Sequence, residues 1–133
     1  MRKILLVDDN LEITSTFAEL LTHDGYECME VDDGWPAITA AATFEPDVIL
    51  MDLDMPGLDG YSAARVIRTQ ERRQNCWIVA LSGRLDIPSI GEENEPFDAH
   101  LSKPISYLAL KLFIQELPQH RLEASQPSQS ANE

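Results

Sequence analysis

The sequence predicts an α/β protein built on a doubly wound, five-stranded parallel sheet with strand order 2-1-3-4-5. Three observations support this fold class. Short apolar, β-favouring runs alternate with segments of helical periodicity, which calls for a parallel sheet with helices on both faces. The run 48–51 is continuously apolar and bounded by turn residues, as in a strand buried on both faces. The length of 133 residues suits one domain.

The expected elements follow from hydrophobic periodicity and from Gly, Pro and Asp punctuation. Strands are expected over residues 3–7, 26–31, 47–52, 76–81 and 98–102. Helices are expected over residues 11–23, 33–44, 60 to about 73 and 106 to about 117. Asp59 and Ser106 precede the last two helices, where their side chains are suited to capping.

Apolar positions within the helices predict which side chains pack on the sheet. In the third helix, Val66 is expected to face inward and Arg68 outward. In the last helix, Leu108, Leu112 and Phe113 are expected to face the core.

Two segments break the alternation. Over 84–96, Pro88, Gly91 and Pro96 frame an acidic run and leave room for only a weak or broken fourth helix. From Pro118 onward the composition turns to Gln, Ser, Pro and Glu, which is typical of disordered chain. We therefore expect a folded domain over residues 1–117 and a disordered polar tail over 118–133.

Charge and cysteine content exclude several classes of function. The formal net charge of -13 argues against a nucleic-acid partner and against an anionic membrane surface, since both require clustered Lys and Arg. The apolar run after Lys3 is too short for a signal peptide, and no stretch approaches a membrane span. Cys28 and Cys76 lack the spacing of a disulfide or metal framework. We expect a cytoplasmic protein.

Polar side chains stand at the ends of four of the five expected strands: Asp8 and Asp9, Asp52, Ser82, and Lys103. The carboxyl ends of parallel strands share one edge, and ligands bind there at the switch point between strands 1 and 3. Three neighbouring carboxylates raise one another's pKa values unless a cation compensates them. Mg²⁺ prefers such oxygen ligands together with water and phosphate. Ser82 is suited to donate to a phosphoryl oxygen, and Lys103 to balance its charge.

Four blocks of the sequence carry a resemblance to a known family: 6–10 (LVDDN), 51–60 (MDLDMPGLDG), 80–83 (ALSG) and 100–104 (HLSKP). In this order and at these intervals they resemble the signature blocks of the response-regulator receiver family, over residues 1 to about 117. The resemblance implies a flavodoxin-like, CheY-like fold and a signalling module rather than an enzyme, with no chemistry beyond its own phosphorylation and dephosphorylation.

The resemblance also implies the reaction and its partners. Asp52 would be the phosphoacceptor, taking a phosphoryl group from a phosphohistidine on a sensor histidine kinase or a histidine phosphotransfer protein. Asp9, Asp52 and the backbone carbonyl of Asp54 would bind Mg²⁺ or Mn²⁺, with Asp8 acting mainly through a water. Phosphorylation would switch the interaction with a downstream protein that the sequence does not name.

The remaining implied roles concern the switch and the turns around the site. Ser82 and Lys103 would contact the phosphoryl group. Pro104 would follow a cis peptide bond, and Gly57 and Gly60 would be structural turn residues.

Two residues depart from the family pattern. His100 stands where the family usually has Tyr or Phe as a rotameric switch, and its charge would depend on pH near neutrality. Asp54 adds a side-chain carboxylate beside the site. We predict that Asp54 alters the dephosphorylation rate or the metal affinity.

Other interpretations of the sequence are also compatible with these motifs. The chain could be a stand-alone receiver or a module of a hybrid kinase. It could also be a binding module that keeps the acids without being phosphorylated. Asp52-Leu53-Asp54 resembles the DxD of haloacid-dehalogenase-type phosphatases, but that family places its motif after the first strand and needs a longer chain.

Overall fold

The computed structural model describes residues 2–55, 57–70, 76–83 and 96–118. The strands are β1 (Lys3–Val7), β2 (Glu27–Val31), β3 (Val48–Asp52), β4 (Trp77–Ser82) and β5 (Ala99–Ser102). The helices are α1 (Leu11–His23), α2 (Gly34–Phe44), α3 (Gly60–Thr69) and α4 (Tyr107–Glu116). These bounds lie close to those expected from the sequence.

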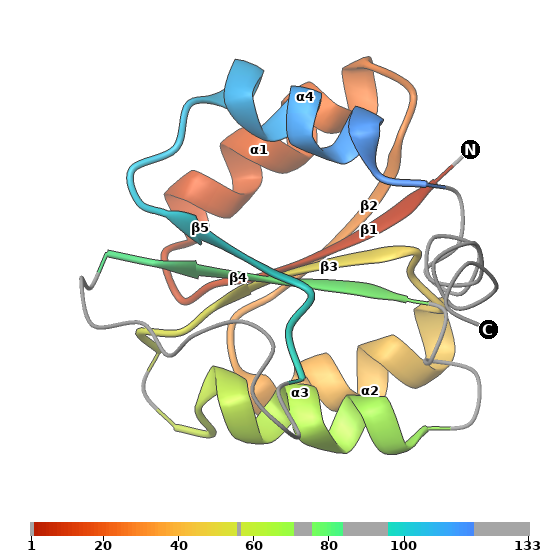
Figure 1. Ribbon diagram of the computed structural model, residues 1–133, viewed down its shortest axis with the longest axis vertical. Helices are drawn as coiled ribbons and strands as arrows, with labels where there is room; N and C mark the ends of the chain where they lie inside the picture. The colour runs from red at the N-terminus through yellow and green to blue at the C-terminus, as the bar shows by residue number, and fades with distance from the viewer. Residues whose placement is uncertain (1, 56, 71–75, 84–95, 119–133) are drawn as a thin grey trace, which may run out of the picture.

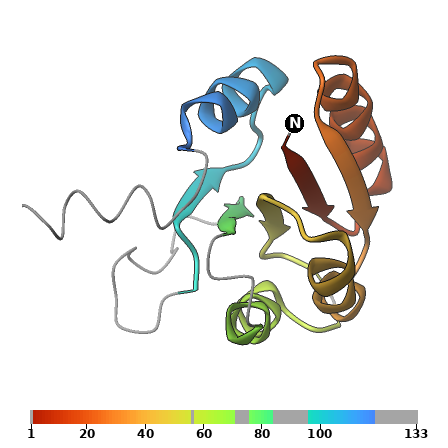
Figure 2. The ribbon, with the colours of Figure 1, turned by 90° about the vertical axis from the view of Figure 1, so that its right-hand side faces the viewer.

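All five strands pair in parallel, in the order β2-β1-β3-β4-β5, which confirms the predicted topology (Figure 2). The chain winds outward from β1 to β2, then crosses to β3 and continues to β4 and β5. The switch point therefore lies between β1 and β3. Asp52 at the end of β3 pairs with Leu81 of β4, so both strands finish at the same edge.

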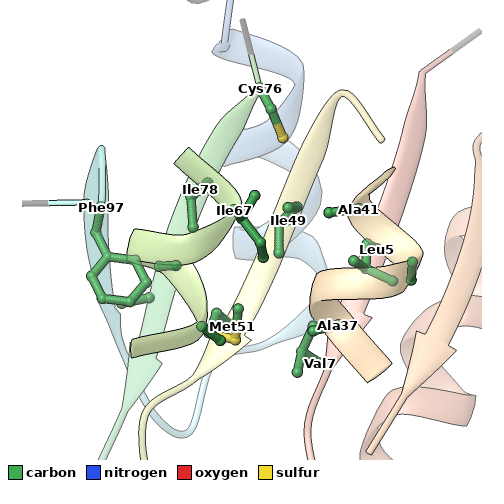
Figure 3. Packing of buried hydrophobic residues seen from close by; sticks show 14 of the residues in the cluster. Leu5, Val7, Ala37, Ala41, Ile49, Met51, Ile67, Cys76, Ile78 and Phe97 are labelled. Atoms are coloured by element: carbon green, nitrogen blue, oxygen red, sulfur yellow. The ribbon is translucent and has the colours of Figure 1, made fainter. Parts of the chain in front are cut away.

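The sheet is covered on both faces, by α1 and α4 on one side and by α2 and α3 on the other (Figure 1). On the α2–α3 side, Ile49 and Met51 of β3 pack among side chains of the neighbouring elements (Figure 3). Ala37 and Ala41 are fully buried there, because small side chains let α2 approach the sheet closely. Residues 48–52 are all buried, as a central strand covered on both faces requires.

The start of each helix is capped by a side chain of the residue before it. Asp59 accepts a hydrogen bond from the Ser62 N–H at 2.9 Å, and Ser106 accepts one from the Ala109 N–H at 3.1 Å. Such caps satisfy N–H groups that have no partner inside the helix, each worth about 1 kcal/mol. The capping expected of Asp59 and Ser106 is confirmed.

Two helix faces differ from expectation. Leu108 and Leu112 of α4 are 64% and 50% exposed, while Leu110 and Ile114 are fully buried. Apolar residues surround almost the whole of α4, so spacing alone left more than one face able to pack. The predicted inward orientation of Leu108 and Leu112 is therefore wrong. Phe113 is partly buried against the core, as predicted.

On α3 the prediction is reversed at two positions. Val66 is 43% exposed, whereas Arg68 turns toward the sheet and its side chain is only 16% exposed. Arg68 donates to the carbonyl oxygens of Pro96 and Cys76 and pairs with Asp98 at 2.5 Å. These acceptors lie just before β4 and β5, so a guanidinium with several N–H donors is satisfied there without facing the solvent.

Two of the segments expected from the sequence lie mostly outside the described residues. The weak helix expected over 84–96 falls on residues outside the described ranges except at Pro96, and so does most of the polar tail. The third helix ends earlier than the expected residue 73, because Gln70 has already left the helix with φ -71° and ψ 134°. Pro118 is described, and its carbonyl accepts from the Trp77 Nε1–H at 3.0 Å. Within the described ranges, no helix combines the length and apolar character needed to cross a membrane.

Candidate functional site

The carboxyl edge of the sheet collects the polar residues that the sequence placed at strand ends. Asp8 follows β1, Asp52 ends β3, Ser82 ends β4 and Lys103 follows β5. Asp8, Asp52 and Ser82 are 4%, 1% and 1% exposed. Burying carboxylates costs free energy unless charges or hydrogen bonds compensate them, so each acid must find partners at this edge.

Asp52 is held by two donors on one oxygen. The Lys103 Nζ lies 2.7 Å from Oδ1, and the Asp54 backbone N–H donates to the same oxygen at 3.0 Å. The lysine is itself positioned by the sheet, since its backbone N–H donates to the Ser82 carbonyl at 2.9 Å. Asp52 is thus anchored through Oδ1 beside a cation that comes from a different strand.

Asp8 lies next to Asp52 and shares its lysine. Its carboxylate is 3.5 Å from the Lys103 Nζ and accepts the Asn10 N–H at 2.9 Å. Burial raises the pKa of Asp8, and the charge of Asp52 raises it further. The hydrogen bond from Asn10 and the charge of Lys103 oppose this rise without cancelling it. The fold therefore disfavours the charge on Asp8 in the absence of a further cation.

Lys103 keeps its charge at this edge. Burial alone would lower the pKa of Lys103, but the hydrogen bond and charge of Asp52, helped by Asp8, raise it above its ordinary value. A permanently charged amine beside Asp52 is suited to neutralising an anionic group that binds there.

Asp8, Asp9 and Asp52 form a cluster with the donor set of a metal site. Each offers one carboxylate oxygen, and these oxygens lie within 4.8 Å of one another. Asp9 is exposed while the other two are buried, so the cluster is open on one side. Hard oxygen donors in this number suit a hard divalent cation that keeps waters or a phosphoryl oxygen in its shell. The residues present therefore fit a bound metal ion.

Asp54 and Gly83 connect the loops that follow β3 and β4. The Asp54 carboxylate accepts the Gly83 N–H at 3.2 Å across the mouth of the site. Sequence reasoning singled out Asp54 but not the Gly83 amide, because a backbone donor leaves no side-chain signature. The sequence signal for this amide was the position of Gly83 directly after Ser82, which ends the strand.

His100 lies on the last strand of the sheet, next to an aromatic side chain. It sits on β5 opposite Ala80, half-buried, with its ring centroid 5.6 Å from that of Phe97. Phe97 in turn meets Tyr61 of α3 edge-on at 5.0 Å. His100 thus belongs to an aromatic group between β5 and α3.

The turn residues around the site have steric reasons for their identity. Gly57 has φ of 77°, and a Cβ there would lie 2.7 Å from a carboxylate oxygen of Asp33. A Cβ on Gly60 would lie 2.9 Å from the carbonyl oxygen of Asp52. At Gly57 the positive φ favours glycine, and at Gly60 the close approach to a backbone oxygen leaves no room for a Cβ. The Lys103–Pro104 peptide bond is cis.

An apolar pocket of about 450 Å³ opens beside the charged cluster. It lies between α1 and the loop after β5, with Ile13 and Phe17 on one wall and Pro104 and Ile105 on the other. Lys103 forms part of its lining, so the pocket and the carboxylates share a boundary.

This combination of a doubly wound sheet, a carboxylate cluster at its switch point and a lysine from the last strand suits the binding of a divalent ion and a phosphoryl group. Residues 4–115 match the family of response regulator receiver domains, and the chain belongs to that family. It is homologous to the receiver domains of response regulators and of histidine kinases.

Several curated proteins are similar in sequence. The sensor kinase/phosphatase CqsS of Vibrio cholerae is 37% identical over 83 residues, covering 62% of this chain and 12% of that protein. Hybrid signal transduction histidine kinase D of Dictyostelium discoideum is 34% identical, covering 81% of this chain and 8% of that protein. The DNA-binding response regulator MtrA of Mycobacterium tuberculosis is 29% identical, covering 77% and 44%. This chain spans less than half the length of each.

Solved structures agree on the fold. The chemotaxis response regulator CheY4 of Vibrio cholerae superposes with a TM-score of 0.76 at 28% identity, covering 86% of this chain and 97% of that one. The receiver domain of a sensor histidine kinase from Pseudomonas aeruginosa PAO1 gives 0.73 at 34% identity, covering 86% and 94%. That structure has a magnesium ion coordinated in its active site cleft.

Proposed function

We propose that this receiver domain is a phosphoacceptor in a two-component phosphorelay, and that Asp52 is the residue phosphorylated. One observation carries the assignment. Asp52 is a 1%-exposed carboxylate at the end of the central strand, 2.7 Å from a lysine amine. The cluster with Asp8 and Asp9 at the neighbouring strand end supports the same reading. A purely structural acid needs its lysine but not two further carboxylates beside it.

The transfer moves one phosphoryl group between two proteins. A carboxylate oxygen of Asp52 attacks the phosphorus of a phosphohistidine, so that an O–P bond forms while the N–P bond breaks. The bonding pair returns to the imidazole nitrogen of the donor, which then takes a proton from solvent. The product is an acyl phosphate on the carboxylate. Lys103 offsets the charge on the phosphoryl oxygens, and Ser82 offers its hydroxyl as a donor to one of them.

The carboxylates at this edge would hold a divalent ion. Asp9, Asp52 and the backbone carbonyl of Asp54 would bind it, with Asp8 acting through a water. Mg²⁺, or Mn²⁺ in its place, supplies neutralisation of the phosphoryl charge when bound. The raised pKa of Asp8 supports this assignment, because burial beside Asp52 disfavours its charge until a cation arrives.

The partners proposed are a sensor histidine kinase or a histidine phosphotransfer protein as donor, and an unidentified protein as target. Leu11 and Ile13, at the start of α1, are 55% and 41% exposed beside the apolar pocket. Exposed apolar side chains around a charged centre suit the docking of a helical donor. The chain acts as a switch rather than an enzyme with turnover. Ser82 and the aromatic group around His100 are the proposed relay to the target surface.

Intact mass spectrometry after incubation with a small-molecule phosphodonor and Mg²⁺ tests the assignment. The wild type should gain the mass of one phosphoryl group, and Asp52→Asn should gain none. Asp32→Asn is the matched control, since Asp32 is an exposed aspartate just after β2 at the same edge, and it should still be phosphorylated.

Three results would point elsewhere. An adduct that persists in Asp52→Asn would refute the site. No adduct on wild type, with a donor that phosphorylates another receiver in parallel, would favour a binding module that works without phosphorylation. Steady hydrolysis of a general phosphomonoester would support the DxD phosphatase reading.

A further inference from the structure

Asp54 bridges two loops at the mouth of the site in a way that the proposed reaction does not use. Its backbone N–H donates to Asp52 Oδ1 at 3.0 Å, while its carboxylate Oδ2 accepts the Gly83 N–H at 3.2 Å. One residue therefore contacts both the proposed phosphoacceptor and the residue directly after Ser82. A carboxylate in this position places an additional negative charge where the phosphoryl group would arrive.

The sheet explains why the Gly83 amide lies at this mouth. β3 and β4 are parallel neighbours with Asp52 opposite Leu81, and the Leu53 N–H donates to the Leu81 carbonyl at 2.9 Å. The chain segments that leave the two strands therefore emerge side by side. Ser82 is buried but Gly83 is exposed, and a Cβ on Gly83 would meet nothing within 4 Å. Its N–H therefore lies at the exposed mouth of the site, where Asp54 Oδ2 accepts it.

A phosphoryl group on Asp52 needs donors of this kind. It adds oxygen acceptors and about two negative charges, which N–H and O–H donors stabilise. Ser82 ends the adjoining strand β4 and Lys103 follows β5, and the Gly83 amide is the next donor along the chain from Ser82. In the unphosphorylated protein that amide is already bound to a carboxylate, the group that most resembles a phosphoryl oxygen in charge and acceptor strength.

We propose that Asp54 is a positioning residue that competes with the phosphoryl group for the Gly83 amide. Phosphorylation then exchanges one anionic acceptor for another, and the Asp54 carboxylate is expelled from Gly83 by like-charge repulsion as well as by competition. Asp54 thereby favours the unphosphorylated arrangement and acts as a built-in brake on the phosphorylated state. The proposal rests on the proposed function of Asp52.

Two substitutions separate the acceptor from its charge. Asp54→Ala removes both, so the phosphoryl group meets no competitor. Asp54→Asn retains an oxygen that can accept the Gly83 N–H but has no charge, so it should compete less well than the wild type. We therefore expect Asp54→Ala to bind a phosphoryl mimic most tightly, Asp54→Asn less tightly and the wild type least tightly. The backbone N–H that holds Asp52 is kept in both variants.

Titration with beryllium fluoride at saturating Mg²⁺ measures this affinity without transfer or hydrolysis. We expect binding about three- to fivefold tighter in Asp54→Ala than in wild type, at the low end of what one hydrogen bond contributes, because the contact is exposed to solvent. Glu12→Gln is the matched control, because Glu12 is an exposed acid in the first turn of α1 at the same edge of the sheet. It removes one negative charge without removing an acceptor from Gly83, and should change the affinity less than twofold.

Amide NMR of Gly83 supplies an independent readout in the metal-free, unphosphorylated protein. The Gly83 proton should shift upfield in Asp54→Ala relative to wild type and stay in place in Glu12→Gln. An unmoved Gly83 signal in Asp54→Ala would overturn the contact. A mimic affinity in Asp54→Ala equal to or weaker than wild type, or equally tightened by Glu12→Gln, would overturn the competition. Failure of wild type to bind the mimic and to form an adduct at Asp52 would instead refute the proposed function, and the brake with it.

Discussion

Charged side chains are arranged differently at the two edges of the sheet. At the amino edge, Arg68 pairs with Asp98 and the Asp47 carboxylate accepts the Lys3 N–H at 2.8 Å. At the carboxyl edge, the Asp8 and Asp52 carboxylates converge on one amine, that of Lys103. The carboxylates named at the amino edge thus have partners within the described chain, whereas those at the carboxyl edge repel each other and share one cation.

This difference separates stability from function. Charges that are paired and hydrogen-bonded at the amino edge hold the start of the strands in register. Carboxylates crowded at the carboxyl edge raise the free energy of the unliganded protein, and a bound cation relieves that repulsion. The comparison predicts that removing charge at the amino edge destabilises the fold, while removing an acid at the carboxyl edge stabilises it.

The largest effect is expected at Arg68. Asp98 is only 10% exposed and also accepts the Ile78 N–H at 2.9 Å, so Arg68→Ala would leave a nearly buried carboxylate without its cation. We expect a loss of about 3 kcal/mol in the free energy of unfolding, measured by urea denaturation. Arg65→Ala, on the exposed side of the same helix, should cost less than about 1 kcal/mol. A similar loss of stability in both variants would mean that the Arg68–Asp98 pair contributes no more than an exposed arginine does.

Metal binding should reduce the repulsion among the carboxylates at the carboxyl edge and so stabilise the folded protein. With free Mg²⁺ at roughly tenfold its Kd, the folded state gains about 1.4 kcal/mol by mass action. Thermal unfolding with Mg²⁺ or with EDTA, at matched ionic strength, measures this gain. Asp9→Asn replaces one carboxylate of the cluster with a neutral amide and should abolish most of this gain. An equal rise in melting temperature for both proteins would mean that the ion acts elsewhere.

Removing an acid from the carboxyl edge should stabilise the metal-free protein. The pKa of Asp8 is raised, so its neutral form is the one the fold prefers. Asp8→Asn keeps an oxygen able to accept the Asn10 N–H and should increase the free energy of unfolding by about 1 kcal/mol in EDTA. Magnesium affinity, measured by calorimetry, should fall in the same variant. Destabilisation in EDTA would contradict the comparison, because it would show that Asp8 is net stabilised by Lys103.

The smallest effect concerns a pair that joins α1 to α4 away from the carboxylate cluster. The hydrogen bond from the Tyr107 hydroxyl, at 2.5 Å, and then the Lys111 amine, at 3.2 Å, hold the pKa of Asp24 below its ordinary 3.8. A lowered folded-state pKa contributes stability that is present above pH 3.8 and is lost as pH falls through the folded-state value. Wild type should therefore exceed Asp24→Asn in stability at pH 7, with the difference shrinking toward pH 3. A difference that does not change with pH would mean that the charge of Asp24 contributes nothing.

Periodicity and turn residues were enough to predict the sheet order and the acidic edge. Val48 to Met51 is apolar without interruption, Asp52 ends that strand, and Asp8 and Lys103 each follow a strand directly. Because parallel strands end together, position along the chain translates into proximity in space. The same reasoning failed on α4, where apolar residues at 108, 110 and 112–114 allow more than one packed face. It failed at Arg68 because the acceptors come from segments distant in sequence.

The sequence by itself determined the fold class, the topology and the residues that crowd the carboxyl edge. These follow from local patterns whose period is fixed by the backbone geometry of strands and helices. Tertiary structure alone decided which oxygen of Asp52 holds Lys103, which face of α4 is buried and where Arg68 points. It also placed the Asp54 carboxylate on the Gly83 amide, a contact between residues 29 positions apart. Such choices depend on the angles at which elements meet, and no local pattern encodes those angles.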